Sequence, residues 1–183
     1  MLGETFTHNG REFYVYAEHD DTIRAPWEDI DVHGIVSEWT TRDKRPSEFV
    51  LATDRRSKRY YDFAETTRIA KRDGWGLCPD ELAKLTMQLG RVPTRKEIVR
   101  RAVLADFIRL RQWCNDQWSY VVLIVKHEES DDYECLGGIE SDDDDGIEMY
   151  ARELADQINE RLNSTAAAEI ADARPDLSPV YAA

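Results

Sequence analysis

One group of residues combines types and spacing that could support metal binding or acid–base chemistry. Asp29, Asp31 and His33 alternate along the chain, so an extended backbone would present all three side chains on one side. Carboxylates and an imidazole held together in this way can bind a divalent metal or exchange protons with a substrate. Spacing places no further ligand beside them, because the other histidines are scattered: His8, His19 and His127. A hydrogen-bonded loop is therefore the favoured interpretation, and a metal-dependent enzyme is an alternative.

A second group, Ser141–Gly146, has the acid-rich composition of a calcium-binding loop. When the loop is aligned on an EF-hand through its glycine, Asp143 and Asp145 fall on ligand positions. However, the twelfth position, which has to supply a bidentate glutamate, is Arg152. The sequence therefore argues against calcium, and we predict no metal and no other cofactor. Acids at a helix N-terminus are favoured by the helix dipole, which accounts for one or two of these carboxylates.

The acidic charge in this part of the chain exceeds what helix capping requires. From Glu128 to Glu148 the sequence contains eleven carboxylates and no Lys or Arg. The run Asp142–Asp145 is expected to face a second acidic turn at Glu128–Asp132, and like charges held close together cost stability. We therefore predict a surface that binds a basic protein. The predicted partner-binding residues are Glu128, Glu129, Asp131, Asp132, Asp142, Asp143, Asp144, Asp145 and Glu148, aided by Glu28, Asp29 and Asp31.

A third group is basic and indicates a different class of function. Residues 82–101 read as a helix, a glycine-containing turn and a basic helix, which is the order of a helix-turn-helix. The basic helix 95–111 would supply the DNA contacts, from Arg95, Lys96, Arg100 and Arg101. Its apolar residues cover much more than one stripe, so only its first turn and a half could lie open in a groove. A DNA-binding accessory or regulatory protein is therefore an alternative function.

Composition bounds the class of protein. The chain has 183 residues and a formal net charge of −13, divided into +8 over residues 55–111 and −21 over the remainder. An acidic exterior repels nucleic acid and membrane surfaces and favours basic partners. The three cysteines are widely spaced, the N-terminus lacks an apolar segment and the run VVLIV is short, so we expect a cytoplasmic protein that does not associate with membranes. The motifs GxxxxGKS/T, GxGxxG, GxSxG and HExxH do not occur, so we predict no enzymatic activity and no catalytic residues.

The elements that must position these residues can be predicted from hydrophobic periodicity and capping patterns. Strands are predicted at Arg11–Glu18, Phe49–Thr53, Lys58–Tyr61, Trp118–Lys126 and Tyr133–Ile139. Helices are predicted from Asp62 to Gly74, Pro79 to Leu89, Arg95 to Asp116 and Ile147 to Leu162. Capping boxes are predicted at two helix starts, formed by Asp62 with Glu65 and by Thr94 with Glu97. Residues 20–47 show neither the helical nor the strand period of apolar residues. We expect a long loop there, which Trp27 and Trp39 hold against the core.

This order of elements predicts an α+β fold, with a mainly antiparallel sheet of about four to five strands and helices packed on one side. One α+β domain is expected over residues 1–163, with 77–93 as a helical insertion. Residues 164–183 are rich in Ala and then contain Pro and Ser, so they are expected to form a flexible C-terminal tail.

Two local features carry expectations of their own. Asp106 falls on an apolar helix face, where an unpaired carboxylate is costly. We expect Arg109, an indole N–H or a backbone group to satisfy it. The pair Gly137-Gly138 indicates a bulge in its strand or the close approach of another backbone.

Several segments resemble one group of proteins. The segments are APWEDIDVHGIVSEW (25–39), TRDKR (41–45), RYYDFAETTRIAKRDGWG (59–76), Ala105–Trp118, and the strand and acidic turn that lead to GIES (138–141). They are similar to a family of uncharacterised proteins encoded in tailed-bacteriophage genomes, and the likeness covers about two thirds of the chain, with 77–96 outside it. The resemblance implies a viral source and the cytoplasm of an infected bacterial host. It implies no activity, so no residue roles are carried over.

Together, the acidic charge and this setting predict a phage-encoded protein that binds and inhibits a host protein. The predicted mode is a DNA mimic in anti-defence, either anti-CRISPR or anti-restriction. Carboxylates would take the place of DNA phosphates on a basic, nucleic-acid-binding surface of the host protein, and affinity would fall steeply with salt. Direct nucleic-acid binding is not expected, and the sequence leaves a homodimer open.

Overall fold

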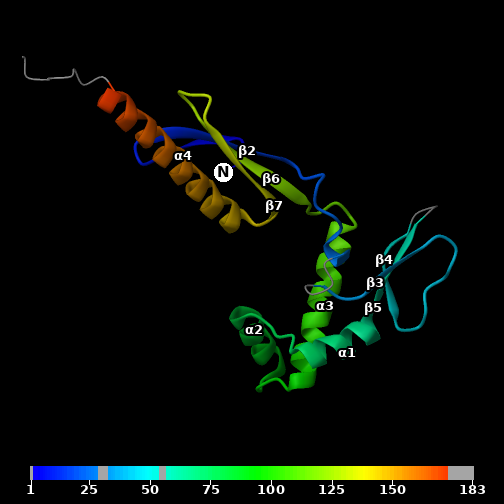
Figure 1. Cartoon of the computed structure of the whole chain (residues 1–183). Helices are drawn as coiled ribbons and strands as arrows, with labels where there is room; N and C mark the ends of the chain where they lie inside the picture. Colours follow the sequence, from blue (N-terminus) through cyan, green and yellow to red (C-terminus); the bar gives the residue numbers. More distant parts are fainter. Residues whose placement is uncertain (1, 29–32, 54–56, 173–183) are drawn as a thin grey trace, which may run out of the picture. The chain divides into compact units, whose positions relative to one another are not determined.

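The contacts of the chain divide it into two compact units. The computed structural model describes residues 2–28, 33–53 and 57–172 (Figure 1). Met1–Ile23 and Ser119–Ala183 form the terminal unit, and Arg24–Trp118 form the central unit. Among the described helices, none combines the length and the apolar character that crossing a bilayer demands.

The terminal unit is a four-stranded antiparallel sheet with a long helix packed on one face. Its strands are β1 (Glu4–His8), β2 (Arg11–His19), β6 (Tyr120–His127) and β7 (Tyr133–Glu140), in the order β1-β2-β6-β7, and its helix is α4 (Asp144–Asp172). β1 is not among the strands predicted from periodicity. Its turn to β2 is Asn9-Gly10, with φ angles of 50° and 80°, and this dipeptide is typical of a two-residue hairpin.

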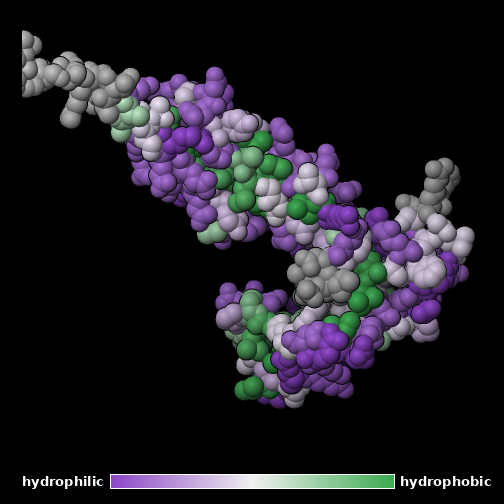
Figure 2. All heavy atoms as spheres, in the orientation of Figure 1, coloured by the Kyte–Doolittle hydropathy of each residue, from purple (hydrophilic) through white to green (hydrophobic). Residues whose placement is uncertain are grey.

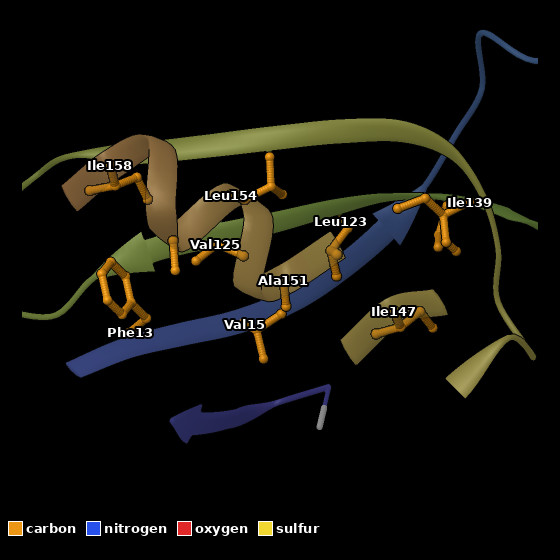
Figure 3. Close-up of a cluster of buried hydrophobic side chains, with 11 residues drawn as sticks. Phe13, Val15, Leu123, Val125, Ile139, Ile147, Ala151, Leu154 and Ile158 are labelled. Atoms are coloured by element: carbon orange, nitrogen blue, oxygen red, sulfur yellow. The ribbon is translucent and has the colours of Figure 1, made fainter. Parts of the chain in front are cut away.

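Packing of α4 across the sheet forms the core of the terminal unit (Figure 3). The helix contributes apolar residues at intervals of three and four, which gives one stripe along its length. Phe13 and Val15 of β2, Leu123 of β6 and Ile158 of α4 are fully buried there. The predicted amphipathic helix is confirmed, and it continues to Asp172, so residues 164–172 of the predicted tail are helical. The rest of that tail, 173–183, lies outside the described residues.

A buried carboxylate explains the two adjacent glycines of β7. Asp20 is 4% exposed, and its side chain accepts hydrogen bonds from Thr22 N, Thr22 Oγ1 and Gly138 N. A Cβ atom at Gly137 would lie 2.7 Å from Asp20 Oδ2, so glycine is required for the carboxylate to approach. Gly138 has a φ of 76°, and the register between β6 and β7 shifts beside it. The predicted bulge is confirmed, and the close approach comes from a carboxylate rather than from a backbone.

The central unit combines a three-stranded antiparallel sheet with α-helices. Its strands, in the order β3-β5-β4, are β3 (Val36–Trp39), β4 (Glu48–Thr53) and β5 (Lys58–Asp62), and its helices are η1 (Pro26–Glu28), α1 (Phe63–Asp73), α2 (Pro79–Leu89) and α3 (Arg95–Trp113). Both predicted capping boxes have their N-cap bond: Asp62 accepts from the backbone N–H of Glu65, and Thr94 from that of Glu97. The core of the central unit consists of Leu51, Tyr61, Ala70, Val99, Val103, Phe107 and Leu110.

Residues 20–47 are more ordered than their sequence predicts. β3 forms within this segment and pairs with β5, and a strand of four residues is too short to show a clear period. Arg42 fixes the connection from β3 to β4 by donating hydrogen bonds of 2.8 and 2.9 Å to Glu48. Trp27 packs against the core of the unit, as expected. The expectation for Trp39 is wrong, because it is 42% exposed and carries the Arg42 guanidinium on its ring.

The α+β class is confirmed, while the arrangement of the sheets differs from the prediction. The described strands form two antiparallel sheets rather than one. Each sheet has its own hydrophobic core, so the contacts divide the region predicted as one domain into two units. The physical reason is that strand pairing is nonlocal. The central unit lies between β2 and β6 in the sequence, yet these two strands pair, and no pattern within either strand identifies its partner.

Truncation of the α4 stripe tests the packing that holds the terminal unit together. We expect Ile158→Ala to lower the free energy of unfolding of this unit by about 2–5 kcal/mol, because it leaves a cavity at a fully buried site. Met149→Ala, on the same helix but 48% exposed, is the matched control and should change this free energy by less than about 0.5 kcal/mol. Hydrogen exchange of the β6 amides in urea measures both variants. Equal effects would contradict the packing.

The Asp20 carboxylate should make stability depend on pH. Hydrogen bonds from the Thr22 side chain and backbone, and from Gly138 N, hold the pKa of Asp20 below its ordinary value. Because the folded pKa is the lower one, this carboxylate stabilises the fold above the unfolded pKa and stops doing so as pH falls through the folded pKa. Asp20→Asn should therefore lower Tm most near neutral pH, with a difference from wild type that shrinks below about pH 4. Thermal melts followed by circular dichroism measure this, and a difference that stays constant with pH would refute the linkage.

Candidate functional site

The two acidic segments that were expected to face one another lie at opposite ends of β7. Residues 128–132 join β6 to β7, and residues 141–143 join β7 to α4. In the hairpin, Lys126 pairs with Tyr133 at one end and Tyr120 pairs with Glu140 at the other. The eight residues of β7 separate the two segments, which corresponds to roughly 26 Å. The expectation that they face one another is therefore wrong, because the hairpin holds them apart.

The outward side of α4 carries further carboxylates between these two ends. The helix begins after Asp143 and runs back along β7, so that Arg161 donates to Glu134 and to the carbonyl of Tyr133 (Figure 1). Opposite the buried stripe it exposes five acids, here called the acidic ridge: Asp145, Glu148, Glu153, Asp156 and Glu160. At 1.5 Å per residue the ridge extends over about 22 Å. Figure 2 shows mainly hydrophilic residues along this helix.

Neighbouring groups hold some carboxylates of the acidic ridge and the carboxylate that precedes the helix. Asp143 Oδ1 accepts from Gly146 N at 3.1 Å, so Asp143 caps α4. Glu148 forms an ion pair of 2.8 Å with the arginine one turn further along the helix. Asp156 accepts a hydrogen bond of 2.9 Å from the amide of Asn9 in the β1–β2 turn. For the other members of the ridge, no ion pair with a described residue is seen: Asp145, Glu153 and Glu160.

The acids of the two predicted segments differ in how far their charge is compensated. In the β6–β7 turn, Asp131 lies 3.4 Å from Lys126 Nζ, and Asp132 lies 3.4 Å from Arg161 Nε. Glu128 and Glu129, in the same turn, are exposed. At the other end of β7, Asp142 and Asp144 are exposed as well. The predicted acids are therefore at the surface, in two groups that the acidic ridge connects.

Charge is divided unevenly between the two units. The terminal unit contains 22 Asp and Glu against 5 Lys and Arg, a net charge of −17. The central unit contains 15 against 19, a net charge of +4. The charge asymmetry of the sequence therefore coincides with the division of the chain into units. A surface as acidic as that of the terminal unit repels nucleic acid and attracts cationic proteins.

The remaining predicted binding residues belong to the central unit. Glu28 lies in η1, where its carboxylate is 3.7 Å from Arg24 Nη1. Asp29 and Asp31 lie outside the described residues, so their roles in partner binding or in a metal site stay predictions. Over 2–28, 33–53 and 57–172, no group of three or more His, Cys, Asp or Glu side chains is arranged to hold a metal ion.

The basic residues of the predicted DNA-contacting helix are exposed in the first two turns of α3: Arg95, Lys96, Arg100 and Arg101. Beyond them the helix is buried in the core of the central unit through Val103, Phe107 and Leu110. Gly90, with a φ of 66°, ends α2, as a turn between two helices requires. However, α2 buries none of its residues, whereas the first helix of a helix-turn-helix packs against the second. The geometry gives the DNA-binding alternative little support.

A second site, in the central unit, is built around Asp106 of α3. Its carboxylate lies 2.6 Å from His33 Nδ1, and it accepts hydrogen bonds from Gly34 N at 2.9 Å and from Tyr61 Oη at 2.7 Å. The side chains of His33 and Asp106 are 14% and 9% exposed. Of the partners expected for Asp106, a backbone group is confirmed. The other two contact each other instead: the Arg109 guanidinium stacks on the Trp118 ring at 3.9 Å, and the Trp118 indole N–H donates to the Arg109 carbonyl.

Close packing around Gly34 fixes this arrangement. A Cβ atom there would lie 2.5 Å from Tyr61 Oη and 2.6 Å from Thr66 Cγ2. The next residue, Ile35, donates its N–H to Thr66 Oγ1 at 3.0 Å. Burial, together with the neighbouring Asp106 carboxylate, raises the pKa of Tyr61, so the phenol stays protonated and serves as a hydrogen-bond donor. Side chains from β5, α1 and α3 therefore hold residues 33–35 in place.

A cavity of about 680 Å³ opens beside this pair of side chains. Its lining includes His33, Trp75, Glu81, Arg101, Asp106 and Arg109. Sequence reasoning singled out both His33 and Asp106 but did not pair them, because they lie 73 residues apart in the chain. The available signal was chemical: an aspartate on an apolar helix face needs a buried donor, and an imidazole in an unassigned loop is one.

Substitution at Gly34 tests the close contact that supports Asp106. We expect Gly34→Ala to lower the free energy of unfolding of the central unit by about 1–3 kcal/mol, because the new methyl group overlaps Tyr61 and Thr66. Gly76→Ala is the matched control, since a Cβ atom at that position meets nothing within 4 Å. Guanidinium unfolding followed by tryptophan fluorescence reports on this unit, which contains all five tryptophans. A smaller loss for Gly34→Ala than for Gly76→Ala would show that the contact does not constrain the fold.

Comparison with protein-family models, with curated proteins and with solved structures finds no match for this chain. The resemblance to the tailed-phage proteins therefore stays an expectation drawn from the quoted segments.

Proposed function

We propose that the chain is a protein-binding molecule whose acidic ridge and adjoining acidic turns engage the basic, nucleic-acid-binding surface of a partner. In the phage setting that the resemblance implies, the partner is a host defence protein, such as a CRISPR effector or a restriction enzyme, and the chain inhibits it. One observation carries the proposal: the terminal unit has a net charge of −17 and exposes acids along one side of a single helix.

The spacing of the acidic ridge supports a likeness to nucleic acid. The five carboxylates span about 22 Å, so their mean spacing along the helix axis is roughly 5–6 Å, against about 3.4 Å along one DNA strand. Because its buried stripe holds α4 on the sheet, these charges are already positioned before binding, and little conformational entropy is lost. A channel that accepts DNA phosphates would meet these carboxylates with its own Lys and Arg, so that affinity falls as salt rises.

Charge also separates this proposal from its alternatives. The exposed basic residues of α3 belong to a unit of only +4, in a chain of −13, so DNA is expected to be repelled. A metal-dependent enzyme would need ligands around His33, and the contact that the structure gives its Nδ1 is the Asp106 carboxylate. Neither alternative has a specific observation in its favour.

Charge reversal on the acidic ridge tests the proposal. The double variant Glu153→Lys, Glu160→Lys should weaken inhibition of a purified DNA-cleaving host defence enzyme. It should also reduce the slope of log Kd against log salt concentration by about 2, because two charge contacts are lost. DNA cleavage assays at increasing salt measure both effects.

The matched control is Glu12→Lys, Glu18→Lys, which makes the same change in net charge on the other face of the sheet. This control should inhibit as well as wild type does. An equal loss in the two double variants would show that net charge alone is responsible, and the acidic ridge would then be rejected as the binding surface. A gel shift of duplex or single-stranded DNA by the wild-type protein would instead favour the DNA-binding alternative.

A further inference from the structure

The pair formed by Asp106 and His33 leaves one ring nitrogen of the histidine available to a ligand. A carboxylate only accepts, so the 2.6 Å contact places a proton on Nδ1. Nε2 has no hydrogen-bond partner among the residues that the structure describes. Asp106 is held in turn by Gly34 N and Tyr61 Oη, so the imidazole is oriented by a carboxylate that cannot easily move. A histidine oriented in this way presents Nε2 as an acceptor or, when protonated, as a charged donor.

The cavity that His33 lines also contains cationic groups. Its volume of about 680 Å³ falls within the range of small-molecule sites. Arg101 and Arg109 both line it and lie two helical turns apart on α3. The Arg109 guanidinium is held against the Trp118 ring at 3.9 Å, while Arg101 is exposed and forms no ion pair with a described residue. Glu81 and Asp106 line the same cavity and balance the two guanidinium groups in formal charge. Because Asp106 is engaged by His33, the exposed Arg101 guanidinium is the group that favours an anion, and its planar geometry matches phosphate oxygens.

The rest of the lining indicates what else the ligand carries. Glu81 of α2 accepts a hydrogen bond of 3.2 Å from Cys78 N, and its carboxylate has capacity to accept further bonds from ligand hydroxyl groups. Trp75 provides an aromatic surface in the same cavity. A phosphate joined to a hydroxylated and partly apolar body would satisfy all of these groups.

We propose that this cavity binds a small phosphorylated molecule of nucleotide size, with His33 Nε2 and Arg101 contacting its phosphate and Glu81 accepting from its hydroxyl groups. This function is independent of the acidic ridge. It uses residues of the central unit, and its ligand is an anion, whereas the ridge would bind a cationic protein. The simpler interpretation is that His33 only fastens residues 33–35 to α3. That interpretation accounts for Nδ1, but not for a cavity that His33 and Arg101 line together.

One substitution separates the two interpretations. In His33→Asn, the side-chain amide nitrogen takes about the place of Nδ1 and can still donate to Asp106, whereas Nε2 has no counterpart. The purely structural role should survive this change, and ligand binding should not. Arg101→Gln removes the exposed charge, and Arg100→Gln is its matched control, because Arg100 is also exposed but does not line the cavity.

Calorimetric titration of the full chain with ribose 5-phosphate, a nucleoside monophosphate and the corresponding nucleoside tests the proposal. We expect saturable binding of a phosphorylated probe, with little binding of the nucleoside. His33→Asn and Arg101→Gln should each raise Kd by about 10- to 100-fold, and Arg100→Gln should leave it unchanged. Tryptophan fluorescence melts establish that each variant is folded.

Three results would overturn the proposal. The first is the absence of saturable binding of both phosphorylated probes up to millimolar concentration. The second is an unchanged Kd in folded His33→Asn and folded Arg101→Gln. The third is an equal loss in Arg100→Gln, which would show that the probes follow the general basic charge of α3 rather than the cavity. If His33→Asn does not fold, Arg101→Gln and its control decide the matter on their own.

Discussion

The apolar stripe of α4 buries one face of the terminal sheet, and the surface of that unit depends on this contact. A helix turns by 100° per residue, so fixing Ile147, Leu154 and Ile158 against the sheet also fixes which side chains point away from it. Acids occupy those outward positions, and their mutual repulsion acts against the helix. Burial of the stripe supplies the opposing free energy, at about 25 cal/mol per Å² of apolar surface removed from water. Acids in the first turn are stabilised further by the helix dipole.

Features that depend on neighbours in sequence could be predicted, and features that depend on distant residues could not. The caps at Asp62 and Thr94 are set within one helical turn and were correctly predicted. The hairpin at Asn9-Gly10 was missed although its dipeptide marks it. The separation of the strands into two sheets, and the contact of His33 with Asp106, arise from pairings that no local pattern contains. The acidic ridge was not predicted as a surface, although the sequence contains the information for it. The period that predicts the apolar stripe of α4 also defines the face on the other side of the helix.

The two proposed ligands follow the division of charge between the units. Charges of both signs mixed evenly over one surface cancel beyond a Debye length, which is about 8 Å at physiological salt. Here the terminal unit has 22 acids against 5 basic residues, so its surface can present a field of one sign, whereas the central unit has 15 against 19 and carries its cations as local groups. The two proposed ligands, a cationic protein surface and a small phosphorylated molecule, would therefore not compete for the same residues.

The central unit is continuous in sequence, whereas the terminal unit is assembled from two segments on either side of it. On the ribosome, β2 is therefore made before the central unit and its partner β6 only afterwards. At typical rates of synthesis the delay is roughly 5–20 s, during which Phe13 and Val15 have neither β6 nor α4 to cover them. The central unit can complete its core in that interval. The acidic surface therefore forms after the central unit has been made, and only on chains whose synthesis has passed through α4.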